Sequence, residues 1–179
     1  MFNKVLVPLD GSELAEAVLP YVEDLGQRCA AEIILLQVVP IPRDTATAPI
    51  FQTPMSLPGS SEDEVVARHP IHRAQEIESL RVETERSLAG VRERLSKAGL
   101  TARVEVLFGR PADRIVEYAL NEGVDLIVMS TLGRSGFSRW MFGSVANKVL
   151  RAAAIPILLI RPPGVGRNAE RLPAAEREP

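Results

Sequence analysis

Five short, almost wholly apolar segments recur along the chain, and longer segments with helical spacing separate them. The apolar segments cover residues 4–8, 32–39, 103–108, 126–130 and 156–160. Continuous apolar runs of this length are typical of strands that are buried on both faces of a sheet. Pro156 opens the last segment, a position that suits an edge strand or the first residue of a strand. The pattern therefore predicts five strands.

The segments between these strands predict four helices, at about residues 10–26, 72–98, 111–122 and 144–153. Asp10, followed three positions later by Glu13, is typical of a helix start. Apolar positions at helical spacing predict buried stripes. These are Leu14, Ala17, Val18, Tyr21, Val22 and Leu25 in the first helix, Ile77, Leu80, Thr84, Leu88, Val91 and Leu95 in the second, and Ile115, Val116, Ala119 and Leu120 in the third.

Strands that alternate with helices favour a parallel sheet with helices on both faces. We therefore predict an α/β fold, a doubly wound five-stranded parallel sheet in the strand order 3-2-1-4-5. Such folds bind ligands beyond the carboxyl ends of the strands, where the strand order reverses, so the loops after the first and fourth strands are the places to search. We assign residues 1–161 to one domain, with a proline-rich insert at about residues 40–71 and a disordered tail at residues 162–179.

Composition narrows the class of protein. The chain has 179 residues, of which 46% are hydrophobic and 25% charged, as in a soluble globular domain. Its net charge of −2 provides no basic surface for nucleic acid. Cys29 is the only cysteine, which excludes an intramolecular disulfide. No apolar run approaches the roughly 18 residues of a membrane span, and no signal pattern is visible, so we expect a cytoplasmic protein without a membrane partner.

The loop after the fourth strand combines glycines with hydroxyl side chains. Glycines let a backbone approach an anion closely, and a helix that opens at Ser144 would turn its first N–H groups toward negative charge. The side chains of Ser130, Thr131, Arg134 and Ser135 are placed to complete a phosphate cradle. The alternative is an ordinary loop in which Ser144 caps the helix. The two best-known phosphate motifs, Gly-x-x-x-x-Gly-Lys-Ser/Thr and Gly-x-Gly-x-x-Gly after the first strand, do not occur.

Several segments, taken in order, resemble the universal stress protein family. Its nucleotide-binding branch carries Gly-x-x-Gly, nine residues, then Gly-Ser/Thr, and this chain has Ser130-x-x-Gly133, nine residues, then Gly143-Ser144. Residues 5–12 resemble the first strand of the family and its aspartate, and residues 34–39 resemble its second strand. Residues 109–115 and 123–129 resemble its third connection and fourth strand. Serine stands here in place of the first motif glycine, and Leu132 stands where histidine is frequent.

The resemblance implies an adenine nucleotide, usually ATP but also AMP or ADP, with Mg²⁺ as an optional companion. Pro8, Leu9, Asp10 and Val38 would hold the adenosine end. The segment from Met129 through Ser130 and Thr131 to Gly133 would pass beneath the ribose and phosphates. Gly143, Ser144 and Val145 would meet the phosphates at the helix N-terminus. We assign no catalytic residue and no metal ligand.

The leading functional hypothesis is a stress-response or regulatory protein in which bound ATP changes conformation or partner choice. Two alternatives stay open: a slow ATP hydrolase or phosphotransferase, and a nucleotide-free dimeric protein that acts through its surface. The resemblance also implies a homodimer. We expect the fifth strand, from Pro156 to Ile160, to pair with its counterpart, because an unpaired apolar edge promotes association.

Overall fold

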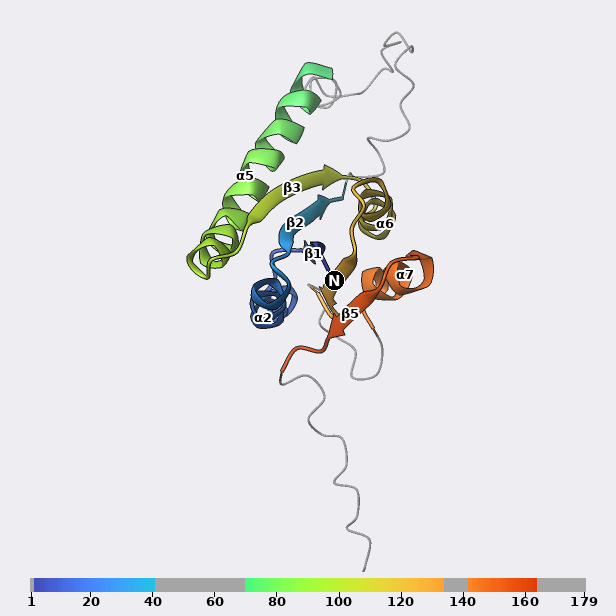
Figure 1. Ribbon diagram of the computed structural model, residues 1–179. Helices are drawn as coiled ribbons and strands as arrows, with labels where there is room; N and C mark the ends of the chain where they lie inside the picture. Colours follow the sequence, from blue (N-terminus) through green and yellow to red (C-terminus); the bar gives the residue numbers. More distant parts are fainter. Residues whose placement is uncertain (1, 41–69, 134–141, 164–179) are drawn as a thin grey trace, which may run out of the picture.

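A computed structural model describes residues 2–40, 70–133 and 142–163 (Figure 1). The predicted tail from residue 164 onward and residues 41–69 of the insert lie outside the described residues. The elements, in chain order, are β1 (Lys4–Leu9), α1 (Glu13–Glu16), α2 (Leu19–Cys29), β2 (Glu32–Val39), α5 (Pro70–Lys97), β3 (Ala102–Phe108), α6 (Pro111–Asn121), β4 (Leu126–Ser130), α7 (Ser144–Ala152) and β5 (Ile157–Ile160).

The five strands form one sheet in the order β3-β2-β1-β4-β5, and every pair of neighbouring strands is parallel. This confirms the predicted fold class and strand order. β1 lies at the centre and pairs with β2 on one side and with β4 on the other. The chain winds from β1 outward to β3 and then crosses back to β4. The strand order therefore reverses beside β1, which places the loops after β1 and β4 at the same edge of the sheet.

Helices cover both faces of the sheet and bury two apolar clusters. Along β1, Val5 and Val7 point into the cluster with α2 and α5, and Leu6 points into the cluster with α6 and α7. Figure 1 shows α2 and α5 on one side of the sheet and α6 and α7 on the other. Val5, Leu6 and Val7 have no exposed surface. Each such side chain stabilises the fold by about 1.5–3 kcal/mol, so the sheet is a rigid base for its loops.

The predicted first helix is wrong in one respect, because the structure divides it into α1 and α2. Ala17 ends α1, and Pro20 lies in the first turn of α2, where a residue without an N–H group begins a helix readily. The break changes the buried stripe, which in α2 runs through Leu19, Val22 and Gly26. Tyr21 was expected inside but is 53% exposed.

Leu120 also differs from the prediction, since it is 55% exposed on α6. The buried face of α6 is fixed by Ala112, Ile115 and Ala119, which are spaced at three, four and seven residues. Leu120 lies one residue beyond Ala119, and one helical residue is a rotation of about 100°. The helix therefore turns it away from the sheet.

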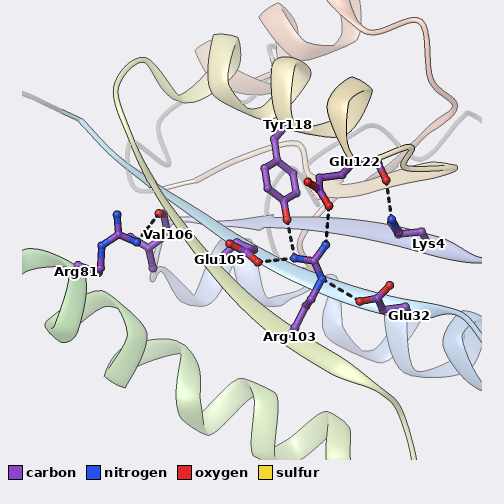
Figure 2. Close-up of polar contacts among 8 residues, drawn as sticks. All are labelled: Lys4, Glu32, Arg81, Arg103, Glu105, Val106, Tyr118 and Glu122. Atoms are coloured by element: carbon purple, nitrogen blue, oxygen red, sulfur yellow. Dashed lines mark hydrogen bonds and ion pairs between the residues drawn. The ribbon is translucent and has the colours of Figure 1, made fainter.

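The amino ends of the strands carry a polar network, which we call the Arg103 cluster: Glu32, Arg103, Glu105, Tyr118 and Glu122 (Figure 2). Arg103 of β3 donates to Glu32 at 2.9 Å, to the Tyr118 hydroxyl at 2.8 Å and to Glu122 at 3.1 Å, and it also pairs with Glu105.

The electrostatics of the Arg103 cluster follow from these contacts. Partial burial lowers the pKa of Arg103, but its contacts with Tyr118, Glu32 and Glu105 outweigh burial and raise that pKa above its ordinary value. Burial and the nearby negative charge of Glu105 raise the pKa of Tyr118, against the lowering effect of Arg103. The arginine is therefore charged and the tyrosine neutral at pH 7, and each has its partners within the protein.

Candidate functional site

The turn after β1 is organised by Asp10. Its Oδ1 accepts hydrogen bonds from the backbone N–H of Ser12 at 3.1 Å and from the Ser12 hydroxyl at 2.6 Å. The Ser12 hydroxyl oxygen then accepts from Ala15 N–H at 3.2 Å and caps α1. The predicted helix cap was Asp10, and the structure corrects it to Ser12. Asp10 instead holds the cap in place, and its carboxylate is half-buried at the end of β1.

Two buried hydroxyl residues lie where β4 ends and the loop after it begins, Ser130 in the strand and Thr131 in the loop. The Ser130 hydroxyl oxygen accepts a hydrogen bond from the backbone N–H of Leu132 at 3.2 Å. Thr131 donates its N–H to Ile160 at 2.8 Å, and its carbonyl oxygen accepts from Gly143 N–H at 2.7 Å. The last bond joins the two ends of the β4–α7 loop, defined here as residues 131–143. The N-terminus of α7 is thereby held beside the end of β4.

Gly133 is the point where this loop meets the turn after β1. A Cβ atom added to Gly133 would lie 2.3 Å from Oδ2 of Asp10, a distance that side chains do not tolerate. The requirement is one of space rather than of backbone conformation, because no left-handed φ is involved at this glycine. Only glycine lets the loop approach the Asp10 carboxylate this closely.

Within the residues that the structure describes, no side chain caps the N-terminus of α7. Gly143 is its N-cap residue, and the first turn contains no acidic residue. This differs from the alternative in which Ser144 caps the helix, since Ser144 is the first helical residue. The leading N–H groups of a helix and its dipole favour negative charge. A Cβ at Gly143 would lie 3.3 Å from the Thr131 carbonyl oxygen, so this approach is also tight.

These features surround a cleft of about 590 Å³ at the carboxyl edge of the sheet. Its size is in the range of sites for small-molecule ligands, roughly 300–1,000 Å³. All the predicted binding residues that the structure describes line it: Pro8, Leu9, Asp10, Val38, Met129, Ser130, Thr131, Gly133, Gly143, Ser144 and Val145. Arg134 and Ser135, the other two predicted binding residues, lie outside the described residues.

Sequence reasoning missed the side of the cleft that α5 and α6 provide. Pro111 and Ile115 of α6 line it, as do Leu80, Glu83, Thr84 and Ser87 of α5. No sequence signal marks these positions, because only tertiary packing brings α5 over the end of β2. Leu80, which was expected in a buried stripe, is 37% exposed because it lies at the cleft. Gln37 of β2 was also missed, although a polar residue within an apolar strand is a signal that could have found it.

The charge distribution along the cleft is uneven. Among the described lining residues the charged side chains are Asp10 and Glu83, and both are acidic. The positive end of the α7 dipole also lies at the cleft, with Ser144 and Val145. The cleft can therefore accept hydroxyl or amine groups at its acidic side chains and an anion at the N-terminus of α7.

In residues 2–40, 70–133 and 142–163 no group of three or more His, Cys, Asp or Glu side chains is arranged to hold a metal ion. Within the same ranges, no helix has the length and apolar character that a membrane crossing requires.

Comparison with known proteins gives consistent results. The sequence pattern of the Universal stress protein family matches residues 1–161. A universal stress protein of Methanothermobacter thermautotrophicus is 35% identical over 161 residues, which cover 90% of this chain and 97% of that protein.

Solved structures resemble the fold. That of MJ0577, a universal stress protein of Methanocaldococcus jannaschii, is 25% identical, with a TM-score of 0.69 over 90% of this chain and 96% of that one. The universal stress protein from Archaeoglobus fulgidus in complex with dAMP is 17% identical, with a TM-score of 0.55 over 89% of this chain and 98% of that one, and it shares the fold.

Proposed function

The chain belongs to the universal stress protein family, and we propose that it binds an adenine nucleotide, ATP, in the cleft between the loops after β1 and β4. Nucleotide occupancy changes the conformation of the protein or its choice of partner and does not fuel turnover. We also propose that the protein is cytoplasmic, as expected from its sequence.

The N-terminus of α7, which no described side chain caps, is the observation that carries this proposal. The hydrogen bond from Gly143 to Thr131 fixes that terminus at the wall of the cleft. An anion at this position would accept hydrogen bonds from N–H groups that no described side chain caps, and it would lie at the positive end of the helix dipole. The triphosphate of ATP is an anion of this kind, and the hydroxyls of Ser130 and Ser144 line the same space.

The remaining walls suit a nucleoside. The Asp10 carboxylate is an acceptor that ribose hydroxyls can use, at the place where Gly133 approaches it. Pro8, Val38 and Met129 offer apolar surface to a purine ring. The universal stress protein from Archaeoglobus fulgidus that was solved with dAMP has the same fold, which supports an adenine nucleotide here.

The test begins with purified protein, denatured and analysed for released nucleotide. We expect adenine nucleotide, and the phosphate count of the released species distinguishes ATP from ADP and AMP. Titration of ATP into nucleotide-free protein, followed by calorimetry, should show saturable binding. No released nucleotide together with no heat of ATP binding would reject the proposal.

Hydrolysis is measured in the same preparation. The proposal predicts a flat time course of phosphate release with intact ATP still bound. Steady release that scales with protein concentration and disappears in Gly143→Val would instead show an ATP hydrolase, because Gly143 touches the phosphate wall and the variant would disrupt it.

We further propose a homodimer formed through β5. In the described structure β5 pairs with β4 along one edge, and Ile157, Leu158 and Leu159 are only half-buried. A second copy aligned along the other edge would cover these side chains and satisfy the free edge of the strand. Light scattering during gel filtration should give twice the chain mass, and a monomeric mass at micromolar concentration would contradict this part of the proposal.

A further inference from the structure

Gln37 interrupts the apolar run of β2 with a side chain that is only 7% exposed. Its amide oxygen Oε1 is buried and accepts no hydrogen bond from the described residues. Buried polar atoms in folded proteins nearly always have a partner, and leaving one without a partner destabilises the fold. Gln37 also lines the cleft. An acceptor is therefore buried at the cleft wall without a described donor.

The position of Gln37 follows from strand alternation. Ile33 and Leu35 lie in the cluster that includes Leu88 of α5, and Gln37, two residues beyond Leu35, lies on the same face of the sheet. It is opposite Leu9 in β1, the last residue before Asp10. The amide thus lies near the adenosine end of the proposed site, on the side that α5 covers.

The hydroxyl groups that α5 contributes to this side have already used their protons. Thr84 donates to the Leu80 carbonyl oxygen at 2.6 Å, and Ser87 donates to the Thr84 carbonyl oxygen at 2.9 Å. Both oxygens retain only acceptor capacity, and Glu83 at the rim adds a carboxylate. This side of the cleft is consequently rich in acceptors, and these include the buried Gln37 oxygen.

We infer that Gln37 is a specificity-determining residue whose Oε1 accepts a hydrogen bond from a donor on the nucleoside. This inference rests on the proposed nucleotide site. Adenosine carries two kinds of donor, the exocyclic amine of the base and the ribose hydroxyls. A purine with an oxygen in place of that amine presents an acceptor instead, which cannot donate a hydrogen bond to the Gln37 oxygen. The acceptor-rich wall therefore selects a ligand by its donors.

The first test compares Gln37→Met with wild type, because methionine keeps the length of the side chain and removes the acceptor. In nucleotide-free protein the variant should unfold at an equal or higher temperature, since no buried acceptor is left without a partner. Its affinity for ATP, measured by calorimetry, should fall by roughly tenfold, the effect of one hydrogen bond to a neutral group. Gln75→Met, the same change at an exposed position of α5, should alter neither quantity.

Nucleotide analogues then identify the donor. Inosine triphosphate lacks the exocyclic amine, and 2′-deoxy- and 3′-deoxy-ATP each lack one ribose hydroxyl. One of these analogues should bind wild type more weakly than ATP does. The same analogue should bind Gln37→Met with the affinity that ATP has for this variant, because the variant no longer uses that donor. The analogue series on wild type also tests the inference independently of how well the variant folds.

The outcomes separate the inference from the proposed function. If wild type binds no ATP, the proposed function fails, and the inference fails with it. If wild type binds ATP but every analogue loses the same factor in wild type and in Gln37→Met, only the inference is overturned, and water is then the partner of the buried oxygen. A large loss of stability in nucleotide-free Gln37→Met would also overturn it, because Gln37 would then support the fold.

Discussion

The amino and carboxyl ends of the same parallel sheet both gather polar side chains, but the partners of these side chains differ. At the amino ends, Arg103 donates to Glu32, Glu122 and the Tyr118 hydroxyl and also pairs with Glu105, so each charge has a neighbour within the protein. At the carboxyl ends, Gln37 has a buried oxygen without a described donor, and no described side chain caps the start of α7.

This difference separates structural polar groups from functional ones. A network that satisfies itself needs no ligand, and its removal should weaken the fold without affecting binding. A cleft that keeps unused donors and acceptors in fixed positions is prepared for a ligand, at some cost to the stability of the free protein. Substitutions at the two ends should therefore change different measured quantities.

The largest effect is expected for Gly133→Val at the cleft. A Cβ at this position would lie 2.3 Å from the Asp10 carboxylate, so the loop or the aspartate must move. We expect ATP affinity to fall by roughly 100-fold. Overpacking costs about 1–3 kcal/mol, and a cost near the upper end of that range corresponds to this loss of affinity. The rise in unfolding temperature that saturating ATP causes in wild type should disappear.

Gly90→Ala is the control for this change. Gly90 lies in α5, and an added Cβ meets nothing within 4 Å. Alanine there should stabilise the protein by about 0.5–1 kcal/mol and leave the effect of ATP intact. If Gly133→Val retained the full ATP-dependent rise in unfolding temperature, the nucleotide would not lie where the two loops meet.

The second-largest effect is expected for Arg103→Met, at the amino ends of the strands. The variant loses three ion pairs and a hydrogen bond to Tyr118. The side chains that form these ion pairs are 33–42% exposed. We expect the free energy of unfolding, measured in urea, to fall by about 1–2 kcal/mol, because partly exposed pairs contribute about 0.2–1 kcal/mol each. ATP affinity should remain unchanged.

Arg28→Met provides the comparison with a single exposed pair, the bond between Arg28 and Asp24. Its effect should stay within about 0.5 kcal/mol, as for most surface substitutions. An equal loss of stability in the two variants would mean that the Arg103 cluster adds nothing beyond an isolated pair.

A smaller effect is expected for Ser130→Ala, which addresses the serine found in place of the first motif glycine. The Ser130 hydroxyl oxygen accepts from Leu132 N–H inside the loop. Without it, ATP affinity should fall by roughly three- to tenfold, the equivalent of about 0.7–1.4 kcal/mol. Ser79→Ala, at an exposed hydroxyl of α5 that donates to Gln75, should bind ATP normally. Unchanged affinity in Ser130→Ala would show that the serine is a neutral replacement for glycine.

The smallest effect concerns acid stability at the amino ends. Asp125 accepts hydrogen bonds from the N–H groups of Asn3 and Lys4 at 2.8 and 2.9 Å, and these bonds lower its pKa. A folded-state pKa below the unfolded value stabilises the protein above about pH 4, and this stabilisation is lost as the pH falls. Unfolding temperatures measured from pH 6 to pH 2 should therefore fall less steeply in Asp125→Asn. Parallel curves would contradict this role.

The fold was predictable because short apolar runs and helical spacing are local properties of the sequence. The strand order and the parallel pairing are as expected, and β2 and β4 have the predicted bounds. The prediction misses the division of the first helix because it does not treat Pro20 as a helix start. Leu120 was misplaced because apolar character alone does not distinguish the edge of a helix stripe from the surface.

The site was predictable only in part. The loops after β1 and β4 were identified from strand order and from resemblance, and their described residues share one cleft. The close approach of Gly133 to Asp10 and the bond between Gly143 and Thr131 join residues far apart in the sequence, so spacing could not reveal them. The α5 wall depends on how one helix packs over β2.

Hydrogen exchange with and without ATP tests the contrast between the two ends most directly. We predict slower exchange, with ATP bound, at the backbone amides of residues 9–12, 130–133 and 143–146, which surround the cleft. Amides of residues 102–106 and 118–122, around the Arg103 cluster, should exchange at the same rate in both states. No ATP-dependent protection at the cleft, or protection confined to the Arg103 cluster, would contradict the assignment of the carboxyl end as the ligand site.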